Sequence, residues 1–106
     1  MNAPESYMTA LLRVIYYAML DARATAALAK GKDTETQGQA LKRIVSLMDV
    51  THNIPMKLVK YDKWDEVLFK KYLADHDKAF PTGIKLLGVY ENGLKKSDEI
   101  ASTENG

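Results

Sequence analysis

Two histidines are the side chains of this sequence best suited to acid–base or metal chemistry, because an imidazole titrates near neutral pH and binds metal ions. His52 follows Asp49 by three residues, the helical spacing of the Glu-x-x-His motifs in di-iron bundles. Such centres need a second copy and two further carboxylates, and Leu73 rather than an acid precedes His76 by three residues. We therefore expect no metal site, and we interpret His52 as an imidazolium near the last carbonyls of a helix.

His76 belongs to a second group of candidates, which would line a ligand pocket on the aromatic face of a helix over residues 56–80. Aromatic rings supply flat apolar surface, and the carboxylate, imidazole and hydroxyl groups supply polarity. The candidate ligand-binding residues are Tyr61, Trp64, Asp65, Tyr72 and His76. The alternative is that His76 has one partner at the core edge, that Asp65 closes a helix start, and that the aromatic side chains belong to the core.

No motif for nucleophilic catalysis or phosphate binding is present. None of the serines stands in a G-x-S-x-G elbow, and Gly83, Gly88 and Gly93 match neither G-x-x-x-x-G-K-[ST] nor G-x-G-x-x-G. The absence of cysteine excludes a thiol nucleophile, a thiolate zinc site and a disulfide scaffold. We therefore predict no catalytic residue, no metal and no cofactor.

Charge and hydropathy limit the classes of partner. The 106 residues carry 15 Lys and Arg against 14 Asp and Glu, a formal net charge of +1. Acidic residues are interspersed among the lysines from Lys57 to Lys71, whereas nucleic-acid-binding proteins gather positive charge on one face. The apolar run at 7–20 contains Arg13, is shorter than the roughly 20 residues that span a bilayer, and has no cationic segment before it. We expect a cytoplasmic protein with no nucleic-acid and no membrane partner.

The elements that must position these side chains are helices. Helical spacing of apolar residues predicts a first helix over 4–30, and Gly31 suits its C-terminal cap. A second helix is expected to begin at Thr34 or Thr36, which start capping-box patterns, and to end at Asn53 before a turn around Pro55. The third covers 56–80, with an interruption near Asp62, whose side chain would cap a new start with Asp65 in its first turn.

The C-terminal region is open to two interpretations. Ile84, Leu87, Glu91 and Leu94 share a face of a short fourth helix, although three glycines weaken it. Asn92-Gly93 is instead a strong signal for a small hairpin within residues 82–97. We favour the helix, and so predict an all-α bundle of three long helices and a short fourth, forming one domain over residues 1–101 with a flexible polar tail at 102–106.

The first helix is apolar on nearly every side. One broad face is expected to form the intrachain core: Met8, Leu11, Leu12, Ile15, Met19, Ala22 and Ala26. A second stripe lies about 180° away and comprises Ala10, Val14, Tyr17, Ala24 and Leu28. Either this helix is the central element of its own domain, covered on both sides by the same chain, or the second stripe contacts a second copy of the protein.

The second stripe favours association over a central position in the domain, because two-fold homodimers are the commonest oligomers. The sequence therefore predicts a small soluble interaction protein that self-associates through its first helix, with an unidentified protein as the alternative partner. A ligand-binding protein or enzyme using the aromatic face of the third helix is the alternative function.

Overall fold

The computed structural model describes residues 5–61 and 63–105, with side chains described for these except Val59 and residues 96–105. Throughout this part of the chain the regular structure is helical, which confirms the all-α prediction. The elements are α1 (Glu5–Ala29), α2 (Thr34–Met48), the π-helical turn η1 (Asp49–Asn53), α3 (Ile54–Lys60), α4 (Glu66–Ala79) and α5 (Leu86–Asn105).

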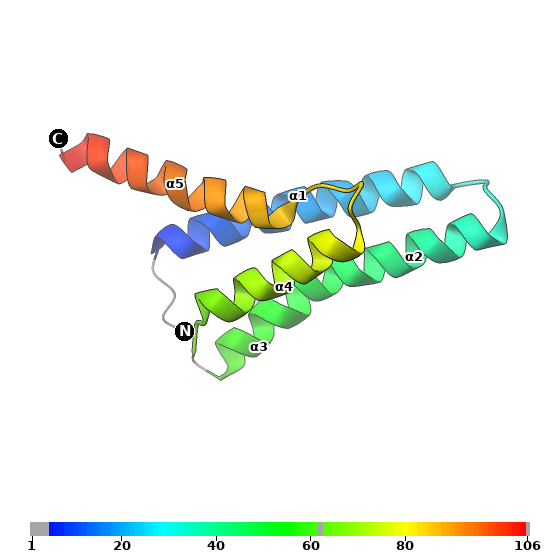
Figure 1. Ribbon diagram of the computed structural model, residues 1–106, viewed down its shortest axis with the longest axis horizontal. Helices are drawn as coiled ribbons and strands as arrows, with labels where there is room; N and C mark the ends of the chain where they lie inside the picture. Colours follow the sequence, from blue (N-terminus) through cyan, green and yellow to red (C-terminus); the bar gives the residue numbers. More distant parts are fainter. Residues whose placement is uncertain (1–4, 62, 106) are drawn as a thin grey trace.

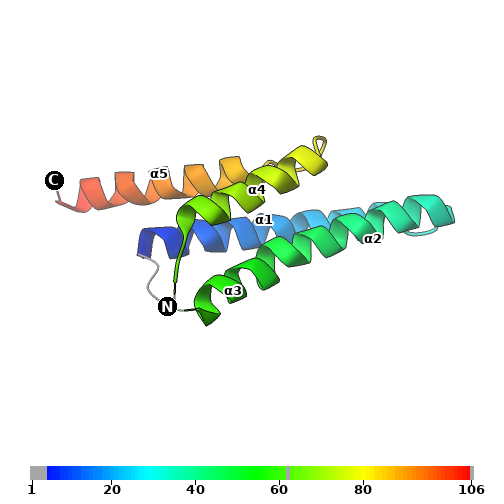
Figure 2. The ribbon, with the colours of Figure 1, turned by 60° about the horizontal axis from the view of Figure 1, so that its bottom comes forward.

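The helices form two layers. α1 runs antiparallel to a rod made of α2, η1 and α3, and these elements form one layer (Figure 1). α4 lies along the rod and α5 lies along α1, so that both cover the same side of the first layer (Figure 2). None of the helices has, among the described residues, a stretch that is long and apolar enough to cross a bilayer.

The first helix agrees with its prediction. α1 begins at Glu5 and ends at Ala29, and Gly31 follows with a φ of 76°, the left-handed conformation that suits glycine. The amide of Lys32 donates to the carbonyl of Ala29 at 3.1 Å and so satisfies one of the last carbonyls of the helix. The chain can then reverse direction within a few residues and enter α2 at Thr34.

The predicted turn at Pro55 is wrong, because the helix continues through this residue. Proline has no amide to donate, and in an α-helix its ring collides with the carbonyl four residues earlier. η1 ends at Asn53, two residues before Pro55, and the amide of Ile54 donates to the carbonyl of Asp49, five residues back. This wider turn accommodates the proline without ending the rod.

The helix predicted over 56–80 is interrupted between Lys60 and Glu66, which confirms the interruption predicted near Asp62. α4 begins at Glu66, and its cap is Asp65, whose Oδ1 accepts the amide of Leu68 at 3.0 Å. Asp65 therefore has the capping role that the sequence assigned to Asp62, and Asp62 lies outside the described residues.

The fourth helix is neither short nor replaced by a hairpin. α5 runs from Leu86 to Asn105, which also makes residues 102–105 of the predicted tail helical. Asp77 of α4 caps it, with Oδ1 accepting the amide of Leu86 at 2.9 Å and Oδ2 that of Leu87 at 3.0 Å. Gly93 marks a close helix contact rather than a turn, because a Cβ at this position would lie 3.0 Å from the Cα of Ala10.

The core lies between the two layers. Phe69 of α4 and Tyr90 of α5 are fully buried, with ring centroids 5.2 Å apart in an edge-to-face arrangement. The remaining buried members of this core come from α1, the rod, α4 and α5: Ala10, Leu11, Val14, Ala18, Leu47, Val50, Leu58, Leu73 and Leu86. The largest side chains thus join α4 to α5, and small residues of α1 let α5 approach closely.

Candidate functional site

The five predicted ligand-binding residues separate into two groups. Tyr61, Asp65 and Tyr72 line one groove between α3 and α4. Trp64 packs against the core, with its ring 5.3 Å from that of Phe69. His76 lies outside the groove and contacts α2 instead.

The groove has a volume of about 390 Å³, within the roughly 300–1,000 Å³ typical of small-molecule sites. Its lining combines aliphatic, aromatic and charged side chains: Ile54, Lys57, Leu58, Tyr61, Lys63, Asp65, Leu68 and Tyr72. Asp65 is engaged as the cap of α4, which matches the alternative interpretation of that residue. A broader depression on the rod shares Ile54 and Lys57 with this groove.

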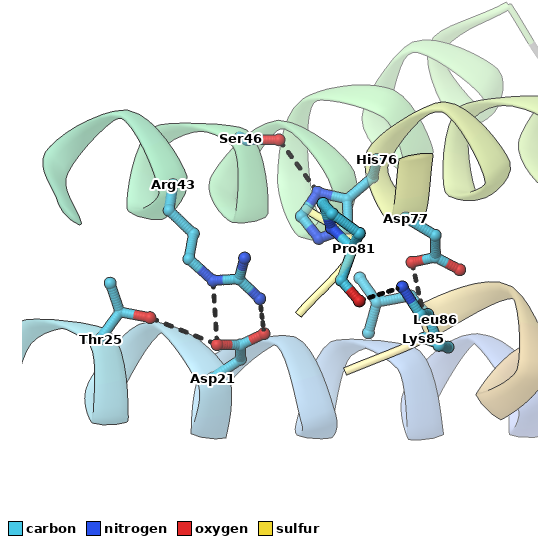
Figure 3. Close-up of polar contacts among 9 residues, drawn as sticks. All are labelled: Asp21, Thr25, Arg43, Ser46, His76, Asp77, Pro81, Lys85 and Leu86. Atoms are coloured by element: carbon cyan, nitrogen blue, oxygen red, sulfur yellow. Dashed lines mark hydrogen bonds and ion pairs between the residues drawn. The ribbon is translucent and has the colours of Figure 1, made fainter. Parts of the chain in front are cut away.

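His76 occupies a buried polar cluster that joins α4 to α2 (Figure 3). Its imidazole is 4% exposed, and Nδ1 lies 3.0 Å from Oγ of Ser46. Burial lowers the pKa of His76 and Arg43 acts in the same direction, whereas Asp77 and Asp21 oppose the shift. The folded protein therefore favours the neutral imidazole.

An ion pair between Asp21 and Arg43 joins α1 to α2 in the same cluster (Figure 3). Nε of Arg43 lies 3.2 Å from Oδ1 of Asp21, and Nη2 lies 2.5 Å from Oδ2. Burial raises the pKa of Asp21, but the hydrogen bond and charge of Arg43 and the hydroxyl of Thr25 outweigh it and hold that pKa below its ordinary value. The guanidinium also lies 4.9 Å from the ring centre of Phe80.

Sequence reasoning did not find this ion pair. The available signal was Asp21 itself, which follows Ala18 by three residues and Val14 by seven and so shares their buried side of α1. The position of Arg43 also explains Gly83, because a Cβ there would overlap the guanidinium.

The contacts of the polar cluster are those of a structural cluster that holds helices together, rather than those of a catalytic centre. Nδ1 of His76 is used by Ser46, and Nε2 is buried without a hydrogen-bond partner in the described part of the chain. Both carboxylate oxygens of Asp77 cap α5. The cluster thus ties α1, α2, α4 and the start of α5 together at one place.

His52 is exposed and lies apart from His76, with its Nδ1 3.1 Å from Oδ1 of Asn53. Asn53 donates in turn to the carboxylate of Asp49 at 2.9 Å, so all three side chains are held locally at η1. Within residues 5–61 and 63–105, no three potential ligands gather around a point that would hold a metal ion.

The predicted self-association stripe on α1 is divided by α5. Ala10 and Val14 are fully buried beneath α5 and are therefore not available to a second copy. Tyr17 is 39% exposed at the edge of α5, while Ala24 and Leu28 are exposed beyond the α5 contact. Conversely, Leu12, Met19 and Ala26, which the sequence predicts in the core, are exposed.

An apolar surface lies instead on the side of the first layer opposite α4 and α5. Asp21 pairs with Arg43, so in this antiparallel arrangement Met19 lies level with Val45, and Tyr16 lies level with Met48. We call this surface the outer face; it consists of Leu12, Tyr16 and Met19 of α1 with Leu41, Val45 and Met48 of α2. These six side chains are between 49% and 64% exposed, and on each helix they lie opposite the residues that contact the second layer.

In comparisons with known proteins, no family model, no curated protein and no solved structure matches this chain.

Proposed function

We propose that this protein is a helical interaction module that forms a two-fold homodimer through the outer face. The observation that carries the proposal is the set of six large, exposed apolar side chains on α1 and α2, among which Met19 is level with Val45 and Tyr16 with Met48. They expose several hundred Å² together, and the largest apolar patch on a typical monomer is about 300–600 Å² and often functional. A standard-size dimer interface buries about 800 Å² on each partner, so the dimer would also bury residues around the outer face.

Charges beside the outer face favour one orientation of the two copies. Lys42 and Asp49 are both exposed and lie 80–100° from Leu41 around the helical wheel, with Lys42 towards the α1–α2 loop and Asp49 towards α3. When two outer faces meet with their α2 helices antiparallel, Asp49 of each copy lies against Lys42 of the other. Such pairs fix orientation more than they add affinity.

Measurement of molecular mass tests the proposal. Sedimentation equilibrium at micromolar concentration is expected to give twice the chain mass of 11.9 kDa. Tyr16→Glu or Val45→Glu should give the single-chain mass with unchanged helical circular dichroism, because either change places a charge in the centre of the outer face.

Val67→Glu is the matched control, because Val67 is also an exposed large apolar residue (80% exposed) but lies on α4, away from the outer face. This variant should remain dimeric. A wild-type mass of 11.9 kDa, or a dimer that Tyr16→Glu and Val45→Glu leave intact, would contradict the proposal.

A further inference from the structure

The groove between α3 and α4 is independent of the outer face and has the features of a small-molecule site. Ile54, Leu58 and Leu68 provide aliphatic surface, and two phenol rings, Tyr61 and Tyr72, complete the lining. Leu58 is buried, whereas Tyr61 is 73% exposed. The groove therefore offers an apolar floor to a ligand that enters from solvent.

The polar groups of the groove differ in whether they already have a partner within the protein. Lys57 and Lys63 are both exposed, and neither has an ion pair with another described residue. Asp65 uses Oδ1 to accept the amide of Leu68 at the start of α4, where the helix dipole offsets its negative charge. The charged side chains of the lining thus carry a net positive charge, beside an apolar floor.

From this combination we propose that the α3–α4 groove binds a small amphipathic carboxylate, with its apolar body on Leu58 and Leu68 and its carboxylate between Lys57 and Lys63. The apolar body is needed because exposed ammonium groups alone bind a carboxylate weakly in water. The ligand needs an anionic group because the two lysines are the cations of the lining, and a carboxylate would pair with them.

Three probes of nearly equal shape test the charge of the ligand: 4-phenylbutyrate, 4-phenylbutanol and 4-phenylbutylamine. Each is titrated into the isotope-labelled full chain while amide chemical shifts are recorded. The carboxylate should shift the amides of Leu58, Leu68 and Tyr72, with those of Tyr16 and Val45 on the outer face unchanged. It should bind about tenfold more tightly than the alcohol and lose this advantage at high salt.

Paired variants test the residues. Lys57→Gln with Lys63→Gln should weaken phenylbutyrate binding about tenfold and leave phenylbutanol binding unchanged. Lys30→Gln with Lys78→Gln removes two exposed lysines elsewhere and should change neither. Equal binding of the three probes, shifts confined to the outer face, or no shifts at all would overturn the proposal. The outcome is separate from that of the dimer test, because Tyr16→Glu should retain the same phenylbutyrate shifts.

Discussion

At the scale of single residues, burial gives His76 a structural role, although its imidazole is capable of acid–base chemistry. Its imidazole contacts Ser46 and lies 5.1 Å from the ring of Phe80, in a cluster closed by the Asp21–Arg43 ion pair. A charged imidazole in this place would lose its hydration and lie near the guanidinium. The cluster therefore makes the neutral form of His76 part of the folded state.

This burial predicts a pH dependence of stability. The pKa of His76 is lowered in the folded protein from its ordinary value of 6.5, so below that pH the unfolded chain binds more protons. The free energy of unfolding should therefore fall as the pH decreases below about 6.5 and through the folded pKa. Urea unfolding at a series of pH values measures this loss. His76→Gln should remove this pH dependence, and His52→Gln, at an exposed position, should preserve it. A wild-type free energy of unfolding that does not change with pH in this range would contradict the prediction.

At the scale of elements, α5 depends on two glycines that have different environments. A Cβ at Gly88 meets no atom within 4 Å, whereas one at Gly93 would lie 3.0 Å from the Cα of Ala10 and 3.1 Å from Cδ of Arg13. Gly88 therefore only lowers the helix propensity of α5, and Gly93 permits the contact with α1.

The two alanine variants should change stability in opposite directions. Gly88→Ala should raise the free energy of unfolding by about 1 kcal/mol, because alanine is the better helix former. Gly93→Ala should lower it by roughly 1–3 kcal/mol, because the added methyl separates α5 from α1. Thermal unfolding of the two variants beside the wild type is the measurement, and a stabilising Gly93→Ala would show that α5 does not pack on Ala10 in this way.

At the scale of the whole molecule, the two layers leave one apolar side uncovered. α4 and α5 cover one side of the α1–α2 pair, and the outer face lies on the other. The proposed dimer would place two such pairs face to face and bury Leu12, Tyr16 and Met19 of each copy beside three residues of α2.

The orientation of that dimer predicts the result of a charge exchange. Lys42→Glu should raise the dimer dissociation constant about tenfold, because it places like charges together at two symmetric positions. Lys42→Glu with Asp49→Lys should restore the wild-type value, and Lys78→Glu, at an exposed site on α4, should leave it unchanged. Sedimentation equilibrium over a concentration series measures these constants. A double variant as weak as Lys42→Glu alone would exclude the antiparallel arrangement.

The sequence alone determined the features that depend on neighbouring residues. Helical spacing and the glycine after Lys30 were enough to place α1, because a helix and its caps are formed by contacts within a few residues. The sequence also placed Tyr61, Asp65 and Tyr72 close together on one short stretch of chain, but it grouped Trp64 and His76 with them, and the packing of α3 against α4 decided which of the five line the groove.

Tertiary structure alone decided which surfaces are buried. α1 is apolar on nearly every side, so its sequence does not distinguish the stripe that α5 covers from the stripe left exposed; the choice depends on the close approach of Gly93 to Ala10. The same is true of Asp21 and Arg43, which lie 22 residues apart and meet only when α1 and α2 pair. Contacts between distant segments are not encoded in the periodicity of either segment, and this is the physical reason that the outer face and the buried ion pair emerged only from the fold.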